Sequence, residues 1–378
     1  MKLYHKISAI AFLLFVFLLT GLFVLLPDSS YSAKEKRNLS QLPEFTLSTV
    51  TNGKFMDGIE DYAADQFPLR DDWMSMKTAV SRLFGAKESQ GVYLMKDGSL
   101  AERFDGSDPK NYQETVDSLL DFSARYPEVN QYFMLVPNAV SVYAENLPKH
   151  ALTEDQESYI RSFYDAIGGN LHCIELFDAF RAIRNNMQLY YRTDHHWTTG
   201  GAYEAFRTAA EAMGLSDSTE YTSGTVCNDF YGSLTSESGF SVKYPDTIDV
   251  CLPVQQADNL YTVTYVSESE RTASCYETAY LSSDDPYQVF FGGNHPLIRI
   301  ETGAASDRSL LVIKDSYANA FIPFLISEYA SITVLDPRYY YDDIDALMGS
   351  NFTDVLFLYN VNTFSEDTNL KMVLRNNQ

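Results

Sequence analysis

The sequence predicts an α/β protein built on a doubly wound parallel sheet flanked by helices. Helix-like and strand-like segments alternate from residue 111 to residue 137, and the alternation returns as β-α-β-α-β between residues 309 and 360. The strand-like runs in both regions are apolar on both faces, which is typical of parallel strands covered by helices. With 378 residues, the chain is long enough to bury a large core around such a sheet.

The chain begins with an uncharged apolar run over residues 7–26. A helix rises 1.5 Å per residue, so this run would span about 30 Å, the thickness of the hydrocarbon core. The run is longer than that of a usual signal peptide, so residues 1–33 are predicted to be an uncleaved signal anchor, with cleavage near Ala33 as the alternative. Lys2 and Lys6 favour a cytoplasmic N-terminus, which puts the rest of the chain outside the cytoplasm.

The segments before the sheet are a tether, two helices and a hairpin. Residues 34–54 are polar and are predicted to be a tether. Residues 55–84 carry apolar side chains at helical spacing, interrupted by Pro68, and so predict two helices. The Asp97-Gly98 pair between two short strand-like runs predicts a tight hairpin turn.

The predicted sheet comes from two separated parts of the chain. Its expected strands are residues 130–136, 310–313, 331–336 and 354–360, and the connecting helices of the second part are expected at 317–330 and 342–348. Residues of about 215–300 are rich in Ser, Thr, Tyr and Asp and predict an inserted β-rich region. Residues 55–378 are therefore expected to form one extracytoplasmic domain.

Charge and cysteine content limit the partners. The formal net charge is −23, with 51 acidic against 28 basic residues. Nucleic acid is excluded as a partner, because binding phosphates requires clustered Lys and Arg. The four cysteines lack the spacing of a zinc site, but in an exported chain they allow one or two disulfides whose pairing the sequence does not identify: Cys173, Cys227, Cys251 and Cys275.

Ser316 occupies a corner that suits a nucleophile. The apolar run at 310–313 leads directly into Lys314, Asp315 and Ser316, and a helical pattern follows. The Ser316 hydroxyl would then stand at the carboxyl end of a parallel strand, where α/β sheets bind ligands, and beside helix N–H groups that stabilise an oxyanion. The alternative is that Asp315 or Ser316 only caps the helix.

The segment TDHHW contains a candidate base with its orienting carboxylate. In an extended chain Asp194 and His196 share one face, and His195 points to the other. Asp194 would then bond one ring nitrogen of His196 and leave the second nitrogen for Ser316. A helix is expected to begin just after Trp197, which would put this corner on the same rim of the sheet as Ser316.

Two other interpretations of these histidines stay open. Adjacent histidines on an extended chain do not easily direct both rings at one ion, and the remaining exported histidines, His150, His172 and His295, are scattered. No metal is therefore predicted, although a metal site is the first alternative. The second is a buried, hydrogen-bonded polar cluster without a function.

Two further strand ends carry candidate substrate-binding residues. Asn362 follows the strand at 354–360, where its amide would donate to an oxyanion or hold the loop in place. Arg338 and the tyrosines beside it follow the strand at 331–336, where they would bind sugar hydroxyls or pack. Tyr317, next to the candidate nucleophile, is a third candidate for contact with substrate.

Taken together, these segments resemble the DHHW family of bacterial exported proteins. That family is similar to the periplasmic alginate O-acetyltransferases of the AlgX and AlgJ type, whose fold is a circularly permuted SGNH hydrolase. The resemblance extends over most of the chain after the anchor and is carried by EKRNLSQLPEF, DYAADQFPLRDDW, FMLVPNAVSVYAENLP, TDHHWTTGGAYEAF, VFFGGNHPLIRI, LLVIKDSYANAF, LDPRYY and DVLFLYNVNTF.

The resemblance implies a catalytic triad of Ser316, His196 and Asp194. KDS stands where SGNH enzymes have GDS, and NVN stands where they have Gly-x-Asn, which makes Asn362 the implied oxyanion donor together with the Ser316 N–H. The Asp-His block precedes the Ser block, as the permuted branch requires. Lys314 in place of glycine departs from the pattern. The residues expected to support the triad are His195, Trp197 and Asp315.

The implied function is O-acetylation of a cell-surface or secreted polysaccharide. No cofactor is expected, because in relatives a membrane-bound O-acyltransferase passes the acetyl group across the membrane. The alternatives are a carbohydrate acetylesterase with the same fold and a non-catalytic subunit that binds the polysaccharide or acts as a scaffold.

Overall fold

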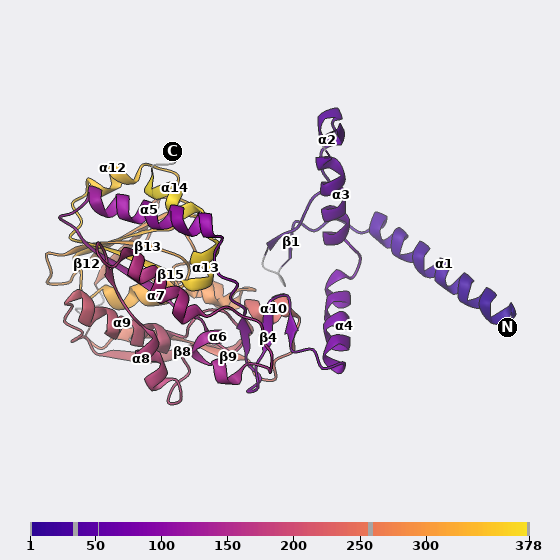
Figure 1. Ribbon diagram of the computed structural model, residues 1–378, viewed down its shortest axis with the longest axis horizontal. Coiled ribbons are helices and arrows are strands. Elements are labelled where there is room, and N and C mark those ends of the chain that lie inside the picture. The colour runs from indigo at the N-terminus through magenta and orange to yellow at the C-terminus, as the bar shows by residue number, and fades with distance from the viewer. Residues whose placement is uncertain (1, 33–36, 52, 256–259, 376–378) are drawn as a thin grey trace. The chain divides into compact units, whose positions relative to one another are not determined.

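A computed structural model describes residues 2–32, 37–51, 53–255 and 260–375 (Figure 1). The chain divides into two compact units. The smaller unit comprises Met1–Gln90 and Thr235–Ser241, and the larger comprises Gly91–Leu234 and Val242–Gln378. Residues 55–90, which the sequence predicts to be part of the domain that contains the sheet, lie in the smaller unit.

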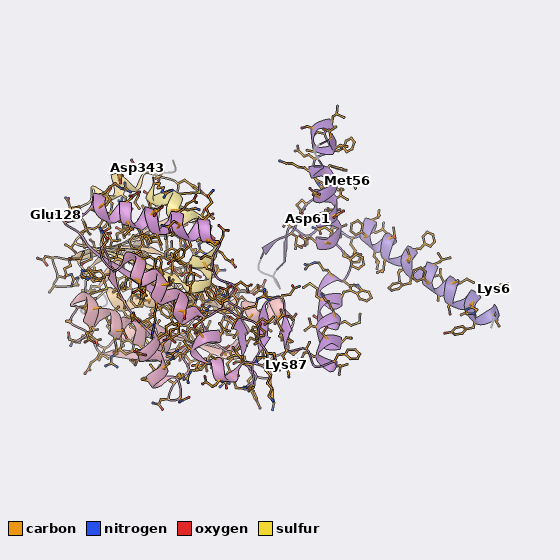
Figure 2. The ribbon with its side chains drawn as sticks, viewed as in Figure 1. Lys6, Met56, Asp61, Lys87, Glu128 and Asp343 are labelled. Atoms are coloured by element: carbon orange, nitrogen blue, oxygen red, sulfur yellow. The ribbon has the colours of Figure 1, made fainter. Side chains whose placement is uncertain are left out.

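The N-terminal apolar run forms the helix α1 (Lys2–Leu25). Its stretch Leu3–Leu25 has a mean hydropathy of 2.7 and is the one helix among the described residues that is long and apolar enough to cross a membrane. The apolar side chains of α1 are exposed along most of the helix. Figure 2 shows them projecting from the helix that carries the labelled Lys6. A membrane anchor and a signal sequence both meet this description.

The two helices predicted around Pro68 are present. They are α3 (Lys54–Asp65) and α4 (Arg70–Leu83). The helix stops before Pro68 because proline lacks an N–H and restricts the residue before it. The remaining elements of the smaller unit are α2 (Leu47–Thr51), β1 (Tyr31–Ser32), β2 (Arg37–Asn38), β3 (Glu88–Ser89) and most of α10 (Ser233–Ser238).

The larger unit contains an eight-stranded sheet in the order β11-β10-β12-β14-β13-β15-β6-β7. The strands from β14 to β7 run parallel, as the sequence predicted. Their bounds are β6 (Asn130–Val136), β7 (His172–Cys173), β13 (Ser309–Lys314), β14 (Ser331–Leu335) and β15 (Asp354–Asn360).

Helices cover both faces of the sheet, as expected for a doubly wound arrangement. Alternate residues of β13 belong to two different hydrophobic cores. Leu310 and Val312 pack in the first core, and Leu311 and Ile313 pack in the second. Figure 1 shows α5 (Pro109–Arg125) and α14 (Asn369–Leu374) on one side and α9 (Thr199–Met213) on the other. Further helical segments of the larger unit are α6 (Ala139–Val142), η1 (Ala144–Asn146), α7 (Gln156–Ile167), α8 (Phe177–Ile183), η3 (Thr278–Ser282), η4 (Pro286–Val289), α12 (Ile344–Met348) and α13 (Val361–Glu366).

The predicted β-rich insertion is partly built into this sheet. Its strands β10 (Tyr261–Tyr265), β11 (Glu270–Thr272) and β12 (Leu297–Thr302) extend the parallel strands as an antiparallel edge. Among the described strands of this region, β8 (Tyr221–Phe230) and β9 (Asp246–Pro253) are the two that form a separate ribbon. The sheet is therefore mixed, because β12 pairs with β14 in an antiparallel orientation.

Two local predictions differ in their outcome. The Asp97-Gly98 hairpin is confirmed: β4 (Val92–Leu94) pairs with β5 (Leu100–Glu102), and Gly98 has the positive φ of 87° that such a turn needs. The helix expected at 317–330 is wrong in length. It consists of α11 (Ala318–Phe321) and the 3₁₀ turn η5 (Ile322–Leu325), because Pro323 interrupts the helical bonding. All four cysteines are free thiols.

Candidate functional site

The structure brings Ser316, His196 and Asp194 together. The Nε2 atom of His196 lies 2.9 Å from the Ser316 Oγ, and its Nδ1 lies 2.6 Å from Asp194 Oδ1. Asp194 and His196 are buried, whereas Ser316 is partly exposed. Ser316 follows β13 at the carboxyl edge of the sheet. Its hydroxyl is accessible to solvent and is hydrogen-bonded to His196, which is in turn bonded to the carboxylate of Asp194.

The chain around the histidines is bent, and the prediction of an extended strand is wrong here. Tyr190 and Trp197 form a single antiparallel bridge, and residues 192–196 bend between them. The Asp194 Oδ1 accepts the His196 N–H at 3.0 Å, a short-range bond that favours such a bend. The rings of His195 and His196 consequently lie 3.9 Å apart instead of on opposite faces.

Asp194 is held by a loop that the sequence did not single out. Its Oδ2 accepts the Ser233 N–H at 2.7 Å. A Cβ atom added at Gly232 would lie 2.2 Å from Asp194 Cβ and 2.4 Å from Oδ2. Only glycine fits so close to the carboxylate, so residues 232 and 233 fix its position together.

His196 is held as a neutral base. Its ring stacks on Tyr287 with the centroids 3.9 Å apart and 15° between the planes. Burial, and next the neighbouring His195, lower the pKa of His196 to about 4 against the opposing effect of Asp194. Donation of the Nδ1 proton to Asp194 leaves Nε2 free to accept the Ser316 hydroxyl proton, a tautomer assigned from the hydrogen bonds.

Three of the predicted residues brace this arrangement. His195 Nδ1 lies 2.7 Å from the Ser233 Oγ, and Trp197 Nε1 donates to the Tyr317 carbonyl at 2.9 Å. The Tyr317 hydroxyl donates to the His195 carbonyl. The Tyr317 side chain is fully buried, so its predicted contact with substrate is corrected to an internal support.

Asp315 ties the nucleophile segment to the next strand. Its Oδ1 accepts the Tyr317 N–H at 2.9 Å, and its Oδ2 accepts the Asn360 N–H at 2.8 Å. The buried carboxylate therefore bridges the ends of β13 and β15 and fixes the backbone on both sides of Ser316.

The polar groups of two predicted substrate-binding residues are engaged inside the protein. Arg338 donates to both oxygens of Asp336, at 2.9 and 2.6 Å. Asn362 donates its amide N–H to the Arg103 carbonyl at 3.0 Å and accepts from Gln156 at 3.3 Å. The Asn362 side chain thus holds its loop in place, which was the alternative interpretation of this residue.

A different asparagine presents its amide near this rim. The Oδ1 of Asn294 accepts from Lys314 Nζ at 2.8 Å and from Asn319 Nδ2 at 3.2 Å. Asn294 is exposed, and among the described residues its amide nitrogen has no hydrogen-bond acceptor. Lys314 is fully buried and also bonds Asp336 at 3.2 Å, so it anchors the side chain of Asn294.

A metal would compete with the hydrogen bonds of this site. One ligand atom each from Asp194, His195 and His196 lies within 4.8 Å of the others, because the bend brings both rings together. A structural zinc site would need a fourth protein ligand, whereas a catalytic one uses three with water in the fourth position, so the number of ligands alone does not decide against a metal. Both ring nitrogens of His196 are already engaged, Nδ1 with Asp194 and Nε2 with Ser316, so binding of a metal by His196 and the proton relay exclude one another.

Comparisons with known proteins identify relatives of the sheet-containing part. Residues 103–335 match the sequence model of a family described as DHHW protein. A DHHW family protein from Eubacterium siraeum has a similar structure, with a TM-score of 0.61 and 26% identity over 77% of this chain and 96% of that one. Bacillus cereus PatB1 with a sulfonyl adduct gives a TM-score of 0.59 and 20% identity over 73% of this chain and 96% of that one.

The O-acetyltransferase domain of Pseudomonas putida AlgJ is a more distant neighbour. Its TM-score is 0.46 and its identity 16%, over 75% of this chain and 99% of that domain. A comparison with curated protein sequences finds no match.

Proposed function

The chain belongs to the DHHW family, and from that premise we propose that it is an O-acetyltransferase acting on a cell-surface or secreted polysaccharide. The observation that carries the proposal is the hydrogen-bonded series from Ser316 through His196 to Asp194, with distances of 2.9 and 2.6 Å. The proposal includes an SGNH-like arrangement that is circularly permuted, since the Asp-His segment precedes the serine in the chain.

Acetyl transfer begins with attack by Ser316. His196 Nε2 takes the hydroxyl proton as Oγ bonds to the acetyl carbonyl carbon. The tetrahedral oxyanion collapses, the bond to the donor oxygen breaks, and His196 returns the proton to that oxygen. Asp194 keeps the imidazole in the required tautomer and stabilises its protonated form. The product is an acetyl ester on Ser316.

A sugar hydroxyl completes the transfer. His196 removes its proton as the oxygen attacks the acetyl-serine, and the proton then returns to Ser316 Oγ as the ester bond breaks. Ser316 is partly exposed, so water competes for the same intermediate, and transfer to water is the acetylesterase reaction of the same site.

The oxyanion is stabilised by the Ser316 N–H and the Asn294 amide. Among the described residues, neither group has a hydrogen-bond partner in the fold, and the side-chain oxygen of Asn294 is fixed by Lys314 at 2.8 Å. Donors that are already oriented stabilise developing negative charge without reorganisation. Asn294 takes this role in place of Asn362, whose amide is bound to Arg103.

In this proposal the chain needs no cofactor and works with a second, membrane-bound protein that supplies the acetyl group. The proposed chemistry uses only groups of the chain itself, and the acetyl group arrives from a membrane-bound O-acyltransferase. The helix α1 keeps the chain at the membrane where that partner delivers it.

Hydrolysis of a chromogenic acetyl ester by the detergent-solubilised full chain tests the nucleophile. Ser316→Ala should reduce turnover to the background rate, whereas Ser350→Ala, at an exposed serine, should keep it. A sulfonyl fluoride should label the peptide containing Ser316. Equal turnover by wild type and Ser316→Ala would refute the assignment. Acetylation of an added oligosaccharide, detected by mass spectrometry, then separates transferase from esterase.

A further inference from the structure

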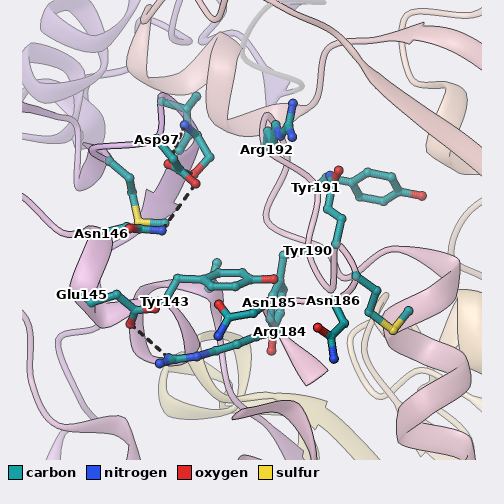
Figure 3. A pocket seen from close by; sticks show the side chains of 16 residues that line it. Asp97, Tyr143, Glu145, Asn146, Arg184, Asn185, Asn186, Tyr190, Tyr191 and Arg192 are labelled. Atoms are coloured by element: carbon teal, nitrogen blue, oxygen red, sulfur yellow. Dashed lines mark hydrogen bonds and ion pairs between the residues drawn. The ribbon is translucent and has the colours of Figure 1, made fainter. Parts of the chain in front are cut away.

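The larger unit contains a pocket of about 640 Å³ that no part of the proposed chemistry uses (Figure 3). Three segments line it: residues 95–100 of the hairpin, residues 139–146 around α6 and residues 184–192 after α8. Its volume lies within the range of about 300–1,000 Å³ that is usual for ligand sites.

One wall of the pocket is fixed to the interior by Asp246. This buried carboxylate accepts from Gln188 Nε2 at 2.9 Å and from the Arg192 N–H at 3.0 Å. Its second oxygen accepts the Thr193 N–H at 2.8 Å. The segment from 188 to 193 therefore has a set position before any ligand arrives, which lowers the entropy cost of binding.

The same wall leads directly to the candidate active site. Arg192 lies two residues before Asp194, and the Tyr191 N–H donates to the His196 carbonyl at 3.2 Å. The Tyr191 ring contacts Tyr287, the ring on which His196 stacks. The segment that lines the pocket therefore continues directly into the bend that carries Asp194 and His196.

The pocket carries fixed polar pairs around an aromatic ring. Asn146 donates to Asp97, and Arg184 forms an ion pair with Glu145 at 3.0 Å. Figure 3 shows Tyr143 between these two pairs. A tyrosine ring offers an apolar surface for the C–H face of a sugar, and the surrounding carboxylates and amides accept and donate to hydroxyls.

The mouth of the pocket has donors that the fold does not use. Asn185, Asn186 and Arg192 are exposed, and their side chains have no polar partner among the described residues. Amide and guanidinium groups are planar and carry several donors in a fixed geometry, which matches neighbouring hydroxyls on one sugar ring.

The charge of the pocket favours a neutral ligand. Glu145 is paired with Arg184, and Asp97 and Arg192 offset one another in formal charge. The whole chain has a net charge of −23, which repels a polyanion, and one exposed arginine does not make the cationic cluster that a polyanion requires.

We infer that this pocket binds a neutral oligosaccharide stretch of the polymer whose hydroxyls receive the acetyl group. The identification of the bound glycan as the acceptor rests on the proposed function, whereas the binding itself does not. A chain seated against Tyr143 and Arg192 is held by the same segment that leads to Asp194 and His196, so another part of the same polymer is the acceptor at Ser316.

Binding is measured by calorimetry with the full chain carrying Ser316→Ala, so that no turnover intervenes, in a detergent without a sugar headgroup. The probes are the neutral cellohexaose, mannohexaose and chitohexaose and the anionic hexamannuronate. At least one neutral probe should bind, and the triple variant Asn185→Ala, Asn186→Ala, Arg192→Ala should weaken it by about tenfold or more. Arg271→Ala, at an exposed arginine on the far edge strand β11, is the matched control and should keep the affinity.

Three outcomes overturn the inference: binding to none of the neutral probes, unchanged affinity of the triple variant, or stronger binding of hexamannuronate. The altered residues are exposed, so the variant should unfold at the same temperature as its parent, which thermal unfolding checks. Neutral-glycan binding without Ser316-dependent ester hydrolysis would refute the proposed function alone. Ester hydrolysis without glycan binding would refute only the pocket.

Discussion

At residue 232 the absence of a side chain determines where the Asp194 carboxylate lies. An added Cβ would overlap Asp194 Cβ at 2.2 Å, so Gly232→Ala should push the carboxylate away from His196. A displacement of about 1 Å costs about 10²-fold in rate, and we expect kcat/KM for ester hydrolysis to fall by that order. Gly224→Ala, where an added Cβ meets nothing within 4 Å, is the control. Equal values of kcat/KM for Gly232→Ala and Gly224→Ala would mean that the position of the Asp194 carboxylate does not affect the reaction.

The pH dependence of the reaction depends on His196. Burial and the neighbouring His195 lower the pKa of His196 from 6.5 to about 4, and only the neutral ring can accept the Ser316 proton. Activity should therefore persist as the pH falls through 6.5 and be lost near pH 4. The profile of kcat/KM reports ionisation of the free enzyme and is the measurement to use. An acid limb centred near pH 6.5 would show that the ring is solvated.

The residues of the site differ in how far the sequence could predict them. Ser316, His196 and Asp194 were predicted to lie together from a strand-to-helix corner and the spacing of Asp and His, and they do lie within hydrogen-bond distance. Gly232 and Tyr287 were missed. They come from the β-rich insertion, and their relation to His196 and Asp194 arises only from tertiary folding.

At the scale of elements, the ends of β12, β13 and β14 determine where Asn294 lies. Buried Lys314 at the end of β13 bonds both Asn294 and Asp336, which follows β14. Removal of one oxyanion donor typically lowers kcat by about 10²–10³-fold, so Asn294→Ala should lower kcat by that order with little change in KM. Lys314→Met, which removes the anchor of Asn294, should lower kcat in the same direction.

Asn362→Ala is the comparison for that prediction, measured by the same ester assay. Its amide binds Arg103, and its replacement should lower stability more than kcat. A fall in kcat of about 10²-fold for Asn362→Ala with none for Asn294→Ala would return the oxyanion role to Asn362.

The parallel strands were predictable because each is a continuous apolar run bounded by turns. The antiparallel edge was not, because β10 mixes buried with partly buried residues, β12 mixes buried with exposed ones, and both resemble the strands of any surface ribbon. Which sheet such a strand joins depends on long-range pairing, here of Ile300 with Ile332. The overlong helix at 317–330 was an avoidable error, since Pro323 stands in its middle.

At the scale of the whole molecule, charge and anchor act in opposite directions. A chain with a net charge of −23 is repelled by the anionic surface of a membrane, which attracts clustered Lys and Arg. Electrostatic attraction therefore does not hold this protein at the bilayer, and under the proposal that α1 is an uncleaved anchor, attachment depends on its burial in the hydrocarbon core.

We therefore expect the full-length protein to remain in the membrane fraction through washes with high salt and alkaline carbonate, and to be released only by detergent. Its intact mass should include residues 1–33. Replacing Leu13 and Phe17 with arginine in the middle of α1 should release the protein from the membrane, because each arginine costs about 2.5–3.5 kcal/mol at the centre of a helix during insertion. Alanine at the same two positions is the control. A mature N-terminus close to Ala33 would instead identify α1 as a cleaved signal sequence, and the acetyl-transfer reaction would then take place on a secreted enzyme.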